Sequence, residues 1–81
     1  MDKLDYAILN FLHINQATSK IKAKTRTDML DNLKMGKDTL YRRIVELIKK
    51  KYVERGFTEG QRHAYFITET GTTKLQEAMG Q

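Results

Sequence analysis

Residues 35–55, MGKDTLYRRIVELIKKKYVER, decide the fold of this 81-residue chain. Aliphatic residues recur in this stretch at helical spacing: Leu40, Ile44, Leu47 and Ile48. The spacing predicts a helix over residues 37–50 with one apolar face. Gly36 favours a tight turn or a cap immediately before that helix. Basic and hydroxyl residues crowd the front of the helix, where core packing alone does not require them.

A short helix is predicted before this turn. Thr25 is a suitable N-cap, and Asp28 three residues later favours a capping box. The apolar face of this second helix predicts an end near residues 32–34. Two helices joined by a turn of a few residues form a helix-turn-helix unit. An amphipathic helix over residues 2–14 and a short strand at residues 21–23 are predicted to precede the unit.

The apolar period changes after the long helix. Residues 52–57 and 64–68 are rich in strand-forming residues and flank a polar tip that contains Gly60, which predicts a β-hairpin. Alternation along the second strand predicts that only one of Tyr65 and Phe66 faces outward. A last helix is predicted from Thr68 or Thr70, with Gly71 as a weak point in its first turn.

These elements predict one α+β domain over residues 1–81. Its fold is a winged helix-turn-helix, with a three-helix core, a β-hairpin wing and a short C-terminal helix. The net charge is +5, and residues 34–63 hold nine basic against four acidic residues. This concentration favours a polyanionic partner, although a lysine-rich surface that only contacts solvent has the same composition.

Other classes of protein have little support in the sequence. The chain has no cysteine and two histidines, so no metal site is expected. No glycine-rich phosphate motif or nucleophile–base set is visible, so neither a cofactor nor an enzymatic activity is expected. The apolar runs are too short to span a bilayer, and no signal peptide is apparent. The expected location is the cytoplasm, without membrane contact.

Two motifs resemble winged helix-turn-helix regulators of the MarR and PadR kind. The first motif runs from Met35 through Gly36, Thr39, Leu40, Arg42 and Ile44 to Val53-Glu54-Arg55, and the second is residues 65–71 followed by Leu75. The resemblance covers about residues 25–78. It departs from the family pattern at Lys51, where glycine is usual, and at Gly36, where a small hydroxyl residue is usual. The long terminal helices with which MarR-like chains dimerise are missing, so the chain resembles a minimal form.

The resemblance implies that the recognition helix enters the major groove of DNA and that the wing contacts the backbone or the minor groove. An arginine can form two bonds to guanine, and a threonine can contact a base edge or a phosphate. The predicted DNA contacts are Thr25, Arg26, Thr27, Lys37, Asp38, Thr39, Tyr41, Arg42, Arg43 and Arg62. Two alternatives stay open: Arg42 and Arg43 pair only with Glu46, or Tyr41 packs on the second helix.

The function expected from these features is that of a sequence-specific regulator of transcription, most simply a repressor that acts by occupying double-stranded DNA. Many such proteins bind as homodimers. The candidate dimer surfaces are the apolar faces of the first and last helices: Leu4, Tyr6, Leu9, Leu75 and Met79. The alternative for these residues is packing in the core, which a domain this small needs. The alternative is a winged-helix adaptor that binds another protein of a transcription or replication complex.

Overall fold

A computed structural model describes residues 1–58 and 60–80 of the chain. Glu59, in the predicted hairpin tip, and Gln81, the end of the predicted domain, lie outside the described residues. The elements are α1 (Lys3–Ile14), β1 (Lys24–Thr25), α2 (Arg26–Asn32), α3 (Lys37–Lys49), β2 (Val53–Arg55), β3 (Ala64–Ile67) and α4 (Glu69–Met79). The α+β winged-helix class is therefore confirmed.

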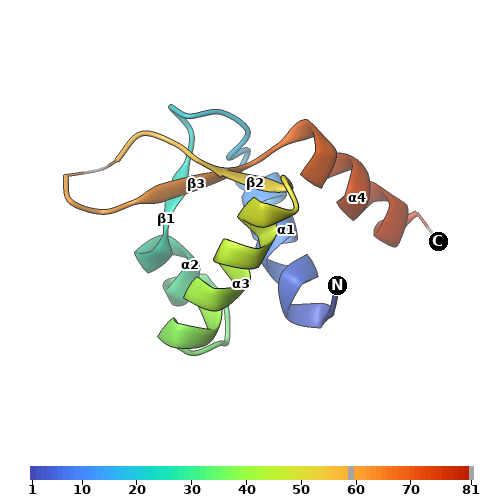
Figure 1. Cartoon of the computed structure of the whole chain (residues 1–81), viewed down its shortest axis with the longest axis horizontal. Helices are drawn as coiled ribbons and strands as arrows, with labels where there is room; N and C mark the ends of the chain where they lie inside the picture. Colours follow the sequence, from blue (N-terminus) through green and yellow to red (C-terminus); the bar gives the residue numbers. More distant parts are fainter. Residues whose placement is uncertain (59, 81) are drawn as a thin grey trace.

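A three-stranded antiparallel sheet has the order β1-β3-β2. In Figure 1, α2 and α3 lie together below the sheet, and the hairpin extends to the left, away from α4. The principal extents are 39 × 25 × 22 Å, and the wing and the C-terminus lie at opposite ends of the longest axis (Figure 1). The wing therefore stands out from the packed helices.

The core forms where α1, α3, α4 and the sheet meet. Leu40, Ile44 and Leu47 are buried from α3, as their spacing predicts, and they pack in one cluster with Ile8 and Leu12 of α1. Burial of this stripe fixes the rotation of α3 about its axis, because the opposite face of the helix must then meet solvent.

Two strand predictions are wrong. Ile21 is 83% exposed in a turn closed by the Lys22 N–H and the Ser19 carbonyl, and the first strand lies later, at Lys24–Thr25. Tyr65 and Phe66 are both buried, so neither faces outward. Strand β3 is the middle strand of the sheet, and the loop after α1 bonds to its end. A strand that is covered on both faces has buried side chains at every position, whereas buried and exposed side chains alternate along a half-exposed strand.

The end of α3 explains why the chain tolerates Lys51 where the MarR and PadR pattern has glycine. Lys51 adopts a left-handed backbone conformation with φ of 66°, which usually favours glycine after a helix. Its carbonyl accepts a hydrogen bond from the Thr68 hydroxyl at 2.6 Å. The chain thus keeps the usual helix-ending geometry, supported from α4.

Gly71 is a requirement of the fold rather than the predicted weak point. A Cβ at this position would lie 2.2 Å from the backbone carbonyl oxygen of Tyr52. The first turn of α4 therefore packs directly on the backbone that follows α3, and only glycine permits that approach.

Replacing Thr68 by alanine should lower the free energy of unfolding by about 1 kcal/mol. Thr68 is the N-cap of α4, and its hydroxyl accepts the Gly71 N–H at 2.9 Å while donating to Lys51. Thr68→Ser keeps the hydroxyl and should retain most of the stability. Urea denaturation of both variants checks this, and equal losses would show that the hydroxyl bonds contribute nothing.

Candidate nucleic-acid interface

The helix-turn-helix unit begins with a complete capping box. The Thr25 hydroxyl accepts the Asp28 N–H at 3.2 Å, and the Asp28 carboxylate accepts the Thr25 N–H at 3.1 Å, as predicted. Thr25 is buried, so its hydroxyl serves the helix. Of the threonines predicted at the start of α2, only Thr27 is exposed.

The N-terminus of α3 is open. Gly36 is the N-cap and provides no side-chain hydrogen bond, so the first N–H groups of α3 have no side-chain cap. Lys37, Asp38 and Arg42 are exposed on the first turns of the helix, and Thr39 is half-buried. A helix start with free N–H groups and a nearby lysine favours an anionic ligand.

A hollow of about 160 Å³ separates the wing from the two helices of the unit. Arg26 of α2, Lys37 of α3 and Arg62 of the wing all line it, together with Gln61 and His63. No carboxylate occurs among the described residues of its lining. The two helices of the unit and the wing thus bring three cations to one concave surface.

Tyr41 links α2 to α3 on the exposed side of the unit. Its ring lies 4.9 Å from the guanidinium carbon of Arg26, a cation–π contact, and the residue remains 43% exposed. The predicted alternative of packing on the second helix is therefore observed. Contact of the Tyr41 hydroxyl with a phosphate remains a prediction.

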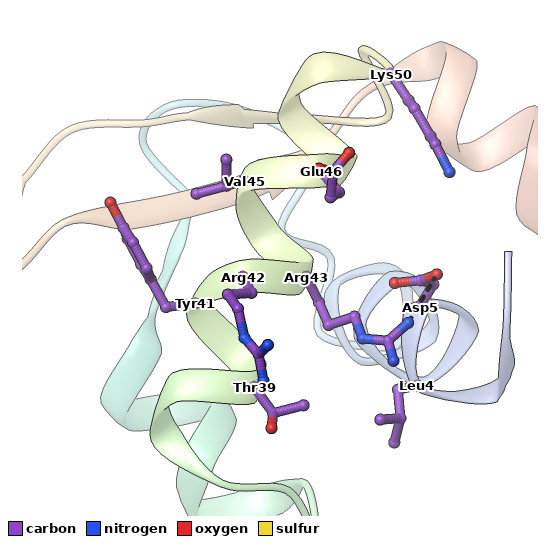
Figure 2. A pocket seen from close by; sticks show the side chains of 9 residues that line it. All are labelled: Leu4, Asp5, Thr39, Tyr41, Arg42, Arg43, Val45, Glu46 and Lys50. Carbon is purple, nitrogen blue, oxygen red and sulfur yellow. Dashed lines mark ion pairs between the residues drawn. The ribbon is translucent and has the colours of Figure 1, made fainter.

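The other side of α3 borders a shallow hollow of about 820 Å³ that extends toward α1 (Figure 2). Arg42 runs along α3 toward Thr39, one turn earlier, whereas Arg43 points across to Asp5 of α1 (Figure 2). Glu46 pairs with Lys49 at 3.7 Å rather than with either arginine. Arg42 forms no ion pair with a described residue, so its guanidinium is available to a ligand.

Arg43 is held by two carboxylates at the start of α1. Its Nη1 donates to Asp2 Oδ2 and lies 3.5 Å from Asp5 Oδ2. Burial raises the pKa of Asp2, but the N–H of Asp5, the bonded Arg43 guanidinium and the N–H of Leu4 together outweigh burial. The net effect is a pKa below the ordinary value of 3.8. Sequence reasoning missed this pairing, because acids near the start of a helix are already explained by the helix dipole and no local pattern connects Asp2 and Asp5 to Arg43.

Asp2→Asn should weaken the dependence of stability on acid pH. A carboxylate whose pKa is lower in the folded chain stabilises it above the unfolded value, near 3.9, and that contribution is lost as pH falls through the folded value. Urea denaturation between pH 2.5 and 6 measures this. Arg43→Gln should remove only part of the effect, because the Leu4 and Asp5 N–H groups still bond to the Asp2 carboxylate. An unchanged pH profile in Asp2→Asn would contradict the assignment.

Two of the predicted dimer-surface residues are core residues. Leu9 and Leu75 are buried, because α1 and α4 pack on each other. Leu4 and Tyr6 are half-buried, and Met79 is 65% exposed. Tyr6 and Met79 line an apolar groove of about 500 Å³ between the two helices. Only the rim of the predicted surface is therefore open to a partner.

Two other kinds of site are absent from residues 1–58 and 60–80. No group of three or more histidine, cysteine or acidic side chains is placed to hold a metal ion in this part of the chain. None of its helices has the length and apolar character needed to cross a membrane.

No protein-family model matches the chain. It is 32% identical over 79 residues to the "DNA-binding protein TubR" of a Clostridium botulinum C phage, and the match covers 98% of each chain. It superimposes on the structure of TubR from Bacillus megaterium pBM400 with a TM-score of 0.90 at 23% identity, over 100% of this chain and 89% of the other. These matches support the predicted winged-helix fold but not the MarR and PadR kind in particular. The chain belongs to the TubR family.

Proposed function

We propose that this chain is a non-enzymatic protein that binds double-stranded DNA through α3 and the wing. The observation that carries the proposal is the convergence of Arg26, Lys37 and Arg62 on one hollow without a described carboxylate. A phosphate backbone is the ligand that such a surface neutralises best. The full-length relative described as a DNA-binding protein supports the same conclusion.

The exposed start of α3 is the proposed reader of base sequence. Arg42 lies on the face opposite the buried stripe and forms no ion pair with a described residue, and the open N-terminus of α3 precedes it. A recognition helix presents such a face to the major groove. Thr39 and Arg42 supply base-contacting groups, Lys37 supplies charge for a phosphate, and Asp38 can accept a bond from a cytosine amine. Arg62 contacts the backbone or the minor groove from the wing. The proposed biological role is regulation of transcription in the cytoplasm, as a repressor acting by occupancy.

Selection of duplexes from a random pool, followed by a salt titration of the selected duplex, tests the proposal. Phosphate neutralisation requires affinity to fall steeply with salt. A plot of the logarithm of the binding constant against the logarithm of the salt concentration should have a slope of about −0.9 for each phosphate contact. The selected motif also reveals the symmetry of the site. The absence of binding to any duplex at low salt would overturn the proposal.

We further infer that a second copy of the chain occupies the groove between α1 and α4. The groove is apolar, and the 65% exposure of Met79 at its rim is large for a hydrophobic side chain. A dimer would place two α3 helices on half-sites roughly 34 Å apart. Sedimentation equilibrium should show a dimer that Met79→Lys dissociates. A monomer would favour the alternative in which the groove binds a different protein and the chain acts as an adaptor.

A further inference from the structure

Lys37 and Arg43, two cations of α3, have different surroundings. On the wing side, Lys37 shares a hollow with Arg26 and Arg62. On the α1 side, the single guanidinium of Arg43 lies between the carboxylates of Asp2 and Asp5. One positive charge therefore meets two negative charges at this point beside α3.

The carboxylate pair is held in place by the backbone of α1. Asp2 Oδ1 accepts the N–H groups of Leu4 at 3.0 Å and of Asp5 at 3.2 Å. Asp5 Oδ2 accepts the Asp2 N–H at 3.2 Å, and the Asp5 side chain is only 10% exposed. The two carboxylates thus form a reciprocal capping box that also presents oxygens to Arg43. Because the helix start fixes the positions of both carboxylates, Arg43 meets a preformed pair of anionic partners within its own chain.

A DNA phosphate would have to compete with this internal site. The Arg43 side chain is one-third exposed, so a phosphate can approach it. An approaching phosphate also meets the charges of Asp2 and Asp5, which repel it. Partly buried ion pairs are screened less by salt than exposed ones. Arg43 is consequently a poor phosphate anchor while both carboxylates are ionised.

We propose that Asp2 and Asp5 act as positioning residues that withhold Arg43 from DNA phosphates. Contact of α3 with phosphates is thereby left to Lys37 and Arg42, which form no ion pair with a described residue. The proposal rests on the proposed DNA binding and refines it, because Arg43 was predicted from the sequence to be one of the contacts. Its consequence is weaker binding to DNA of arbitrary sequence, since that binding depends on phosphate neutralisation.

The double variant Asp2→Asn/Asp5→Asn tests the proposal. Asparagine keeps a side-chain oxygen for the capping hydrogen bonds and is as good an N-cap as aspartate, so α1 should still form, which circular dichroism verifies. Release of Arg43 should add one phosphate contact to a random-sequence duplex and raise the magnitude of the salt slope by about 0.9. Between 50 and 200 mM salt, the affinity of the double variant for the random-sequence duplex should therefore fall by a factor roughly 3.5 times larger than that of the unaltered chain.

The effect should depend on Arg43. Arg43→Gln should leave the slope of the unaltered chain unchanged, and it should cancel the gain in the double variant. Glu69→Gln/Glu77→Gln is the matched control, because it removes two exposed carboxylates from α4, away from α3. The salt slope of this control should differ from that of the unaltered chain by much less than the roughly 0.9 expected for one phosphate contact.

Three results would overturn the proposal, and they separate it from the proposed function. If Arg43→Gln alone lowers the slope as much as Lys37→Gln, Arg43 already contacts phosphate. If the double variant behaves like the α4 control, the carboxylates are only a structural link between α1 and α3. Both results leave DNA binding itself intact, whereas failure of the unaltered chain to bind any duplex at 50 mM salt removes both proposals.

Discussion

Replacing Leu47 by alanine should lower the free energy of unfolding by about 2–5 kcal/mol. Leu47 lies on the buried face of α3 and is only 1% exposed within the core cluster. Alanine would leave a cavity there, and the surrounding side chains would collapse into it only in part. A domain of this size has a total stability of roughly 4–12 kcal/mol, so the loss is a large fraction of it. Urea denaturation followed by circular dichroism measures the difference.

Two variants set the scale for that result. Leu47→Met nearly conserves the volume and should lose less than about 1.5 kcal/mol. Ile21→Ala removes a side chain that is 83% exposed and should change stability by no more than about 0.5 kcal/mol. A Leu47→Ala protein as stable as the Ile21→Ala protein would show that the rotation of α3 is misassigned, and with it the face proposed to contact DNA.

Replacing Arg42 by alanine should weaken binding to the selected duplex by about 1–3 kcal/mol and relax the preference at one base position. Arg42 is exposed on α3 and forms no ion pair with a described residue. Its guanidinium can therefore form two hydrogen bonds to guanine without first breaking an internal contact. Titration of selected and random duplexes at one salt concentration measures the effect.

Arg62→Ala provides the comparison for Arg42. Its side chain extends from the wing, and loss of a backbone contact should weaken selected and random duplexes to a similar degree. Arg42→Ala should instead affect the selected duplex far more than the random one. Equal losses on both duplexes would assign Arg42 to phosphate contact and leave the base-reading role to other residues of α3.

The fold was predictable to the extent that local patterns specify it. Helix α3 was predicted at residues 37–50 and is observed at Lys37–Lys49, because its apolar stripe and Gly36 are strong local signals. The cap at Thr25 was predicted for the same reason. The first strand was misplaced, because Ile21 and its neighbours have strand propensity without a partner strand. Strand pairing is a tertiary contact, and it occurs at Lys24 and Thr25 instead.

The predicted site depended more heavily on tertiary structure. The exposure of Lys37 and Arg42 follows from the rotation of α3 about its axis, which the sequence indicates through the apolar stripe of the helix. The proximity of Arg26 and Arg62 to Lys37 could not be derived in this way, because it depends on how the wing folds back toward α2. The burial of Thr25 was also missed, and the sequence left open whether Leu9 and Leu75 lie in the core or on a dimer surface, since a single helix does not reveal which neighbour covers it.

The sequence by itself determined the elements, their order and the apolar face of the recognition helix. These follow from spacing, caps and glycine, which act over a few residues. Only the tertiary structure decided the role of neighbouring arginines in that helix. Arg42 and Arg43 are adjacent and chemically identical, yet the 100° between successive helical residues leaves one in solvent and turns the other toward Asp2 and Asp5. The acids that separate their roles lie 38 or more positions away in the chain, where no local pattern connects them to α3.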